Sequence, residues 1–381
     1  MVTLNAVGDI MLSDKVGEKI ALNGADYLFN KISHILYEAD INIGNLECPL
    51  SYRGEIYNYN KEYSFRASPD CAKSLKDAGF NILCLANNHT MDYGPLALYD
   101  TISVLEKQGI SHIGAGKNLE EACKPLIYEI KGLKIAFLAF TYAYSAKKKR
   151  PGCCPCDLNF VQKQVSLVKH TVDLVIVSIH YGIEYVDYPG KHIISLFRGA
   201  VDAGASLVLG HHPHVVQGLE IYSNALICYS LGNFIDCYAD EEVREKSYKN
   251  TALAYFSNHP PEVNDLRTIE TFILQCKLNS KGVSDYKLIP IKSKKDFQLI
   301  MMNDYESQIF LKRVREISKK LSEQDDVIFD EMDSLLKKCE IYYLQKMRLR
   351  DIFLKIFNLR PHHFKLLIPF LKAKLSRNLI D

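Results

Sequence analysis

The sequence predicts an α/β domain, and three observations support this prediction. Short apolar runs alternate with helical patterns through roughly the first 230 of the 381 residues, which is the element order of α/β folds. The runs are too short for helices and are apolar throughout, as expected of buried strands. After residue 235 the pattern changes to a pair of strands and then to charged helical sequence.

Seven apolar runs are predicted to be strands. They cover residues 4–7, 41–43, 82–85, 135–140, 174–179, 207–209 and 226–229. Three helices between them are predicted from capping residues and terminal glycines. They run from Ser68-Pro69 to Gly79, over 94–108 before Gly109, and over 191–203 before Gly204.

The last part of the chain differs from the rest. Residues 270–291 are predicted to form two strands around the turn at 279–282 and to complete the sheet. From about residue 303 the sequence is helical and charged, so we expect one domain over 1–300 and a C-terminal helical region over 301–381. Its final stretch, 350–381, has seven Lys and Arg against two Asp. A helical appendage packed on the domain is favoured, and a basic amphipathic segment resting on a membrane is the alternative.

Composition places the chain among ordinary globular proteins, with 48% hydrophobic and 24% charged residues. A formal net charge of +2 gives no argument for nucleic acid as a partner. The odd number of cysteines, 11, argues against a complete disulfide framework and indicates a reducing compartment. The sequence also shows neither a signal peptide nor a membrane-spanning run. We therefore expect a cytoplasmic protein, with contact to the inner membrane through 350–381 as the alternative.

Six of the predicted strands end in a polar cluster. Ligands of α/β folds bind beyond the carboxyl ends of the strands, so clusters that are scattered in the sequence are expected to converge there. The clusters are Gly8-Asp9, Gly44-Asn45-Leu46-Glu47, Ala86-Asn87-Asn88-His89, His180-Tyr181-Gly182-Ile183-Glu184, Gly210-His211-His212-Pro213-His214 and Ser230-Leu231-Gly232-Asn233-Phe234.

These residue types together predict a metal centre. Carboxylates, amide oxygens and imidazoles suit Zn, Mn or Fe, and they can share two ions a few ångströms apart. Single residues have structural alternatives, such as a turn or helix cap for Asp9 and loop hydrogen bonding for His89. The run from His211 to His214 is the strongest signal, because three imidazoles in four residues have little structural purpose. We expect one or two divalent ions.

In this order, the six clusters resemble the CapA family of poly-gamma-glutamate capsule biosynthesis proteins, which are related to the calcineurin-like metallophosphoesterases. The third cluster continues as Asn87-Asn88-His89-Thr90-Met91-Asp92-Tyr93-Gly94, and the resemblance covers roughly residues 2–236, more than half of the chain. It implies a four-layer α-β-β-α sandwich with a C-terminal helical appendage. It also implies a metal site at one end of two packed sheets.

The resemblance implies roles for single residues. Metal ligands are implied at Asp9, Glu47, Asn88, His180, His212 and His214, with Glu47 in the position of a bridging aspartate. His89 matches the catalytic histidine of metallophosphoesterases. Residues expected to support the ligands or to contact substrate are Asn45, Asn87, Asp92, Glu184, His211 and Asn233, of which Glu184 could orient a ligand imidazole.

Three positions depart from the related proteins. Metallophosphoesterases usually carry a histidine two residues after the first aspartate, where this chain has Met11, and the change removes one ligand from one metal position. Glu47 is one methylene longer than aspartate. These two departures bear on the number of bound metals and on whether phosphoester chemistry is retained. Tyr181 stands where relatives often have Trp, which is a mild change.

The expected reaction is metal-assisted hydrolysis or transfer, as in a phosphoesterase, on an anionic small molecule or polymer. Metal-bound water can supply hydroxide at neutral pH, and His89 would protonate the leaving group or stabilise its charge. Cleavage of a gamma-glutamyl or similar amide lies within the same class. The alternative class is a non-catalytic metal-binding accessory protein for assembly or export of a polyanionic polymer. An amidohydrolase barrel is disfavoured, because its His-x-His pair usually lies near the N-terminus.

The loop 147–156 contains four basic residues and three cysteines. It follows the strand at 135–140 and could border the site and attract an anion, although a solvated loop is favoured. A second zinc site on its three cysteines has no obvious fourth ligand nearby. Arg53 and Arg66 are further candidates for binding an anion, against the usual position of arginines in solvent.

Overall fold

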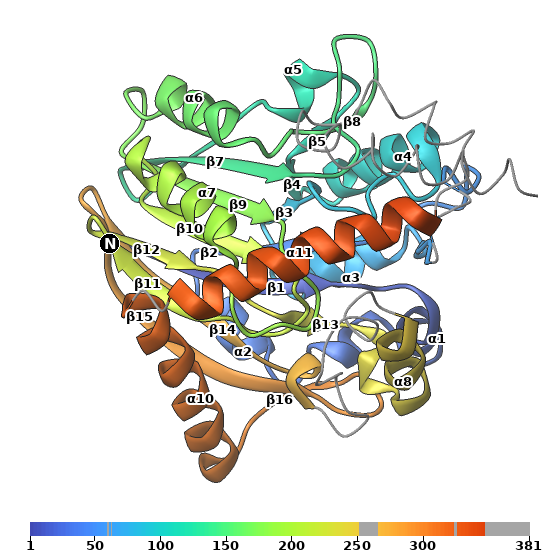
Figure 1. Cartoon of the computed structure of the whole chain (residues 1–381). Coiled ribbons are helices and arrows are strands. Elements are labelled where there is room, and N and C mark those ends of the chain that lie inside the picture. Colours follow the sequence, from blue (N-terminus) through green and yellow to red (C-terminus); the bar gives the residue numbers. More distant parts are fainter. Residues whose placement is uncertain (59–60, 62, 251–265, 324–325, 347–381) are drawn as a thin grey trace, which may run out of the picture.

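The structure is a computed structural model that describes residues 1–58, 61, 63–250, 266–323 and 326–346, with strands at its centre and helices around them (Figure 1). The strands are β1 Val2–Ile10, β2 Ile41–Leu46, β3 Ile82–Cys84, β4 Ser111–Ile113, β5 Ala115–Gly116, β6 Leu126–Ile130, β7 Leu133–Thr141, β8 Gly152–Cys153, β9 Leu174–His180, β10 Leu207–His211, β11 Leu219–Tyr222, β12 Ala225–Cys228, β13 Asn233–Ile235, β14 Glu270–Asn279, β15 Gly282–Ser293 and β16 Leu299–Met301. The helices are α1 Asp14–Asn23, α2 Ser33–Tyr37, α3 Cys71–Asp77, α4 Gly94–Lys107, α5 Leu119–Ala122, α6 Leu158–Val168, α7 Lys191–Asp202, α8 Glu241–Asn250, α10 Asp304–Ser322 and α11 Asp326–Lys346.

The first sheet carries half of the polar clusters to one edge. Its strand order is β16-β15-β14-β1-β2-β3-β4, and β13 pairs in parallel with the end of β1. Because β1, β2, β3 and β4 run parallel, their carboxyl ends lie together. In this register Asp9 lies between Asn45 of β2 and Asn233 of β13. The hairpin of β14 and β15 around residues 279–282 confirms the predicted strand pair.

The second sheet has the order β11-β12-β10-β9-β7-β6. Its central strands β7, β9, β10 and β12 are parallel, and β6 and β11 are antiparallel edges. His180 at the end of β9 lies opposite His211 at the end of β10. Both sheets therefore end in metal-binding residue types at their carboxyl ends.

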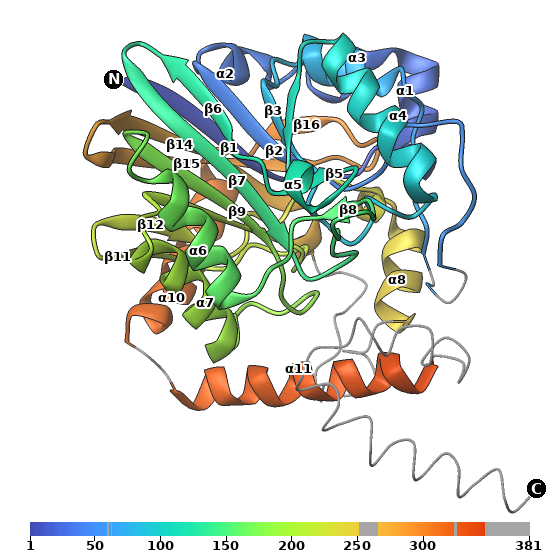
Figure 2. The same ribbon diagram turned by 90° about the horizontal axis from the view of Figure 1, so that it is seen from above.

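The continuous apolar runs are explained by burial on both faces of the strands. In β7, Ile135 and Phe137 belong to the core between the two sheets, whereas Ala136 and Leu138 pack in the layer with α6 and α7. Figure 2 shows α2, α3 and α4 outside the first sheet and α6 and α7 outside the second. The predicted four-layer α-β-β-α sandwich is confirmed.

The three predicted helices are present as α3, α4 and α7. Helix α3 begins at Cys71 rather than at the predicted Pro69, because the Asp70 N–H donates to Ser68 Oγ (3.1 Å) in a turn that precedes the helix. The short strands β4, β5, β8, β13 and β16 were not predicted, because two or three residues are too few to show a repeating apolar pattern. The equally short β3 was predicted as part of the apolar run 82–85.

The C-terminal helical appendage is confirmed in α10 and α11. Asn303 and Glu306 form a capping box that starts α10, which buries Phe310 against the domain. In α11, Asp333 Oδ1 lies 2.6 Å from Nδ1 of His192 on α7, and Figure 2 shows this helix running along one side of the molecule, below α7 and α8.

The membrane alternative for 350–381 concerns residues outside the described part of the chain. Among the helices that are described, none is both long and apolar enough to cross a bilayer.

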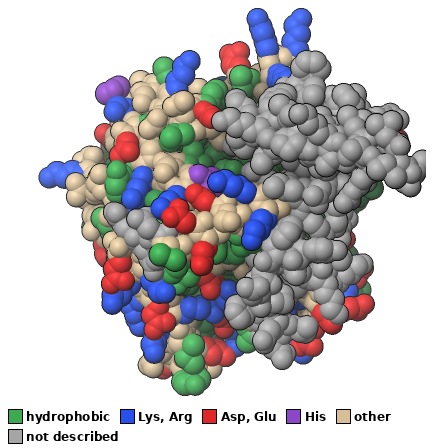
Figure 3. Space-filling view, in the orientation of Figure 1, with side chains coloured by type: hydrophobic (Ala, Val, Ile, Leu, Met, Phe, Trp, Pro, Cys, Tyr) green, Lys and Arg blue, Asp and Glu red, His purple; other side chains and the backbone are tan. Residues whose placement is uncertain are grey.

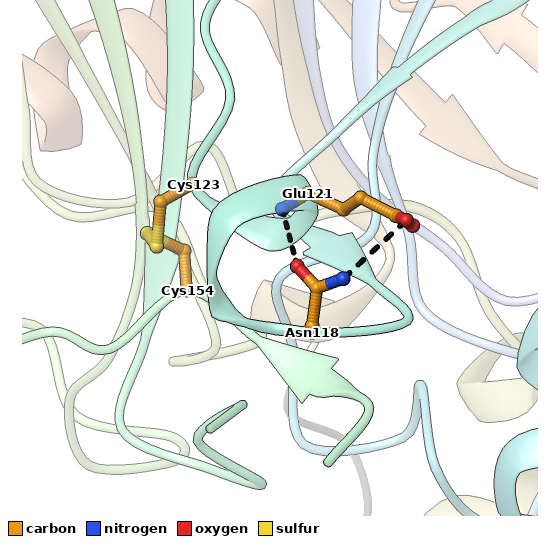
Figure 4. The surroundings of a disulfide bond; sticks show 4 residues. All are labelled: Asn118, Glu121, Cys123 and Cys154. Carbon is orange, nitrogen blue, oxygen red and sulfur yellow. Dashed lines mark hydrogen bonds between the residues drawn. A yellow bond between two sulfur atoms is a disulfide. The ribbon is translucent and has the colours of Figure 1, made fainter. Parts of the chain in front are cut away.

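A disulfide joins Cys123, at the end of α5, to Cys154, just after β8 (Figure 4). The nine other cysteines are buried and form no disulfide. The alternative of a zinc site on the three cysteines of the loop is wrong, because the sulfur of Cys154 is already bonded. Such a bond is typical of an oxidising environment rather than of the reducing compartment indicated by the odd cysteine count.

We predict that Cys154→Ala lowers the free energy of unfolding by about 2–4 kcal/mol, because the disulfide restricts the unfolded chain. Guanidinium unfolding without reductant measures the loss, and Cys276→Ala, at a buried free cysteine, controls for the lost side chain. Dithiothreitol should destabilise the wild type by a similar amount and leave Cys154→Ala unchanged. Wild-type stability that does not respond to reductant would contradict the bond.

Candidate metal centre

The polar clusters meet where the carboxyl ends of the two sheets approach each other. Nδ1 of His211, from the second sheet, lies 3.1 Å from Oδ1 of Asp9, from the first. Nδ1 of His180, also from the second sheet, lies 3.2 Å from Nδ2 of Asn45, from the first. Residues separated by more than 200 positions in the sequence therefore form one site.

Asp9 is a fully buried carboxylate with several partners. Its Oδ1 accepts a hydrogen bond from Asn45 Nδ2 (2.8 Å), and its Oδ2 accepts one from the backbone N–H of His212 (3.2 Å). Burial raises the pKa of Asp9, but the hydrogen bond from His211 and the charges of nearby histidines lower it more, to well below its ordinary value. Asp9 is therefore an ionised carboxylate that the surrounding hydrogen bonds hold in place.

Glu47 is fully buried as well, but its carboxylate is uncompensated. Neither Oε1 nor Oε2 has a hydrogen-bond partner within the described structure, although Oε1 lies 3.3 Å from Nε2 of His180. Burial, together with the charges of Asp9 and Asp236, raises the pKa of Glu47 well above its ordinary value. A buried polar group without a partner costs about 1–3 kcal/mol, and a bound cation would remove this cost.

Two groups of three buried residues are spaced to hold a metal ion. Asp9, Glu47 and His180 offer ligand atoms within 4.8 Å of one another, and so do Glu47, His212 and His214. Glu47 belongs to both groups, as a ligand that bridges two ions would. The oxygen and imidazole donors suit Zn, Mn or Fe. The unpartnered atoms, both Glu47 oxygens and Nδ1 of His212, fit a divalent ion.

The imidazoles of the site differ in the direction in which their pKa values are shifted. Burial lowers the pKa of His180 well below its ordinary value, and burial with the charge of His214 lowers that of His212 to about 3. Both are therefore neutral, which is the form that binds a metal. Burial also acts against the charged form of His214, but the charges of Asp9 and Asp236 outweigh it and raise the pKa of His214.

The backbone of the histidine loop is strained. His212 has a φ of 98° and His214 a φ of 58°, a conformation that costs on the order of 1–3 kcal/mol per residue and is often found at functional sites. The loop is held by the Tyr185 N–H, which donates to the Pro213 carbonyl (2.7 Å), and by Asn233, whose Oδ1 lies 2.8 Å from Nδ1 of His214. The surrounding structure therefore enforces the direction of these imidazoles.

Two glycines permit the close approach of backbones beneath the site. A Cβ on Gly8 would lie 1.9 Å from the carbonyl oxygen of Gly232, and one on Gly210 would lie 2.0 Å from that of Tyr229. Any side chain at either position would push the strand ends apart and disperse the ligands.

His89 lies beside the ligand cluster and is paired with Asp92. Nδ1 of His89 lies 2.7 Å from Oδ2 of Asp92, and the backbone N–H of His89 donates to Oδ1 of Asn87 (3.0 Å). The neighbouring Asn88 turns its Oδ1 to within 2.7 Å of Nε2 of His180. Burial, and then the charge of Lys61, lower the pKa of His89 to about 4. Its imidazole is neutral at neutral pH before substrate binds.

Two residues at the site were missed by the sequence analysis. Nζ of Lys61 donates to Oδ1 of Asp92 (2.5 Å) and lies 2.8 Å from Nδ1 of His89. Asp236 is buried directly after β13, and burial raises its pKa to about 6 against the charge of His214. Extending the last polar cluster by two residues would have found Asp236. Nothing in the sequence around Lys61 marks it.

The other predicted residues differ in their distance from the ligands. Asn87 is a supporting residue, since its Nδ2 donates to Asn45 Oδ1 (3.1 Å) and to the Leu46 carbonyl (2.7 Å). Glu184 is half-buried, and its charge acts on Glu47 and on Lys61, which places it at the same end of the sheets.

The candidate anion-binding residues do not join the ligand cluster. Arg53 pairs with Asp100, and Arg66 stacks over the ring of Tyr93 at 4.1 Å. The basic loop 147–150 closes on itself through backbone hydrogen bonds between its two ends. On the described part of the face in Figure 3, basic and acidic side chains are interspersed.

The chain is similar in sequence to bacterial capsule synthesis proteins. The family model described as bacterial capsule synthesis protein PGA_cap matches residues 3–238. The PGA biosynthesis protein CapA of Bacillus subtilis (strain 168) is 38% identical over 234 residues, which cover 60% of this chain and 62% of that protein. The capsule biosynthesis protein CapA of Bacillus anthracis is 36% identical over 244 residues, which cover 61% and 59%. The chain thus spans less than two thirds of the length of these relatives.

Among solved structures, that of a novel phosphatase from Mycoplasma pneumoniae aligns with a TM-score of 0.47 and 16% identity, and the alignment covers 82% of this chain and 99% of that one.

We predict that Glu47→Gln has opposite effects on stability without and with metal. In metal-free protein at pH 8 it should raise the free energy of unfolding by about 1–3 kcal/mol, because the buried Glu47 side chain must either carry an unpartnered charge or keep a proton that the unfolded chain has released. With Zn or Mn bound it should lower the stability, because a shared ligand is lost.

The pH dependence of the metal-free protein follows from the raised pKa of Glu47. Above about pH 4.3 the unfolded chain releases a proton that the folded protein retains, so wild-type stability should fall as pH rises. Glu47→Gln should reduce this fall, as unfolding curves at pH 5 and pH 8 would show. The same sign of effect with and without metal would contradict a ligand role for Glu47.

Proposed function

The chain belongs to the bacterial capsule synthesis protein PGA_cap family, and on that premise we propose that it is a metal-dependent hydrolase that acts on an anionic substrate in capsule polymer synthesis. The observation that carries this proposal is Glu47, a buried carboxylate whose two oxygens lack partners within the described structure and which belongs to both groups of metal-binding residues. A structural role would not require an uncompensated carboxylate at this place.

The residues that would hold metal are those of the two groups. Asp9, Glu47 and His180 would form one position, and Glu47, His212 and His214 the other, with Asn88 beside His180. Bound metal would supply an acidic water and polarise a phosphoryl or carbonyl oxygen.

His89 would donate a proton to the leaving group. Asp92 faces its Nδ1, so Nε2 is the nitrogen that would meet substrate. An anionic group beside Nε2 would raise the pKa of His89, since an opposite charge favours the imidazolium. The imidazole would thus take up a proton together with the substrate and donate it to the departing oxygen or nitrogen.

A non-catalytic accessory role in polyanion assembly or export is the second candidate. One observation favours it. Met11 stands where metallophosphoesterases carry a further histidine ligand, and its side chain is buried in the core between the sheets. One metal position therefore has fewer ligands than hydrolysis by two ions would use, and a metal could stabilise the domain without bond chemistry.

Metal content tests the site directly. We predict near-stoichiometric Zn, Mn or Fe in wild-type protein by elemental mass spectrometry and a loss of metal in His212→Ala, because His212 is a neutral, buried ligand. His170→Ala, at an exposed histidine, is the matched control and should retain metal. Full metal content in His212→Ala would remove that residue from the site. Absence of metal in the wild type after reconstitution would contradict a metal centre altogether.

Activity separates the two candidate functions. Metal-loaded wild type is tested on phosphoester and gamma-glutamyl amide substrates, and we predict that His89→Gln lowers kcat by about 10²–10⁴-fold without loss of metal. His34→Gln, at an exposed histidine, should leave kcat unchanged. A metal-loaded wild type that is inactive on both substrate classes would favour the accessory role.

A further inference from the structure

Lys61 places an ammonium group inside the site, and neither the metal positions nor the leaving-group chemistry accounts for it. It lies in the loop between β2 and α3, and only 19% of its side chain is exposed. Nζ of Lys61 is within hydrogen-bond distance of three atoms on one turn: the Asn88 carbonyl oxygen (2.7 Å), Oδ1 of Asp92 (2.5 Å) and Nδ1 of His89 (2.8 Å). Lys61 thus contacts the turn that carries His89 at both of its ends.

The same loop makes further contacts with this turn. The Phe65 N–H donates to Oδ2 of Asp92 (2.8 Å), and the Tyr57 N–H donates to the Asp92 carbonyl (2.8 Å). The ring of Phe65 lies 4.7 Å from that of His89, centroid to centroid. The position of Asp92, and through it that of His89, therefore depends on a segment some 30 residues earlier in the chain.

The hydrogen bonds determine where the proton of His89 lies. Asp92 accepts from Lys61 on one oxygen and from the Phe65 N–H on the other, as an ionised carboxylate does. Its Oδ2 also lies 2.7 Å from Nδ1 of His89, and a carboxylate oxygen is the acceptor there for a proton on Nδ1. Lys61 can only donate, and the Asp92 oxygen and the Asn88 carbonyl take two of its hydrogens. The lone pair of His89 is then on Nε2.

We propose that Lys61 is a positioning residue for the reaction: it holds Asp92 and the Asn88 carbonyl so that His89 stays in the Nδ1–H tautomer and keeps Nε2 for the substrate. The consequence for catalysis rests on the function proposed above. The tautomer does not, because it is a property of the protein in the absence of substrate. Lys61 acts through Asp92 and Asn88 and touches no reacting atom.

The test uses the full chain labelled with ¹⁵N-histidine, with the His89 signals assigned by their loss in His89→Gln. Long-range ¹H–¹⁵N correlation spectra distinguish the two imidazole tautomers. Wild type should show the Nδ1–H form of His89, and Lys61→Met should show a mixture of both forms with unchanged metal content. Lys131→Met removes an Asp-paired lysine at the opposite end of the strands and should leave the His89 signals as in wild type.

Kinetics of the metal-loaded protein give the second measurement. Lys61→Met should lower kcat by about 10²-fold, the scale of a displaced proton-transfer group, and leave KM little changed. Lys61→Gln, which keeps a donor for the Asn88 carbonyl, is measured in parallel and should also show mixed tautomers.

The outcomes separate this proposal from the proposed function. A pure Nδ1–H tautomer in both Lys61 variants overturns the positioning role, even if the wild type is an active hydrolase. A mixed tautomer in the variants supports that role, even if the wild type cleaves none of the substrates tested. Loss of fold and metal together in both variants would show that Lys61 is a structural cation only, and this too overturns the proposal.

Discussion

Two buried carboxylates at the meeting of the sheets are the constraint on which this structure depends. Asp9 ends β1 and Glu47 follows β2, and these strands are parallel neighbours. A charge removed from water costs several kcal/mol unless it is compensated. Asp9 is compensated by hydrogen bonds from Asn45 and the His212 backbone, whereas neither oxygen of Glu47 has a hydrogen-bond partner among the residues that the structure describes. Glu47 is therefore the carboxylate whose burial a bound cation would compensate.

Other features of the site follow from this constraint. The histidine loop keeps a strained backbone at His212 and His214. At Gly8 the backbone approaches so closely that a Cβ would collide with the carbonyl oxygen of Gly232. Such strain persists only where the surrounding packing over-determines it. Here the sheets supply that packing, since the core between them is continuous beneath the ligands. The packing that stabilises the two sheets thus also holds the residues of the candidate metal centre in place.

The residues that position His89, the proposed proton donor, are separate from the candidate metal-binding residues. His89 takes its position from Asp92, and Asp92 takes its own from Lys61 and the Phe65 N–H. None of these residues belongs to the two groups spaced for a metal. Variants of the candidate metal-binding residues should therefore change metal content, and variants of His89, Asp92 or Lys61 should change proton transfer. Comparing the two kinds of variant can distinguish a hydrolase from an accessory protein.

The sequence by itself determined the layers of the fold and most of the residues of the candidate metal centre, because apolar runs and the polar clusters that end them are local patterns. It predicted Asp9, Glu47 and the histidines of the second sheet in this way. Only the tertiary structure decided that Glu47 lacks a hydrogen-bond partner among the described residues, that Cys123 pairs with Cys154, and that Lys61 reaches His89. Each of these facts depends on how separate segments of the chain pack together. That packing leaves no periodic or compositional pattern in the sequence of either segment.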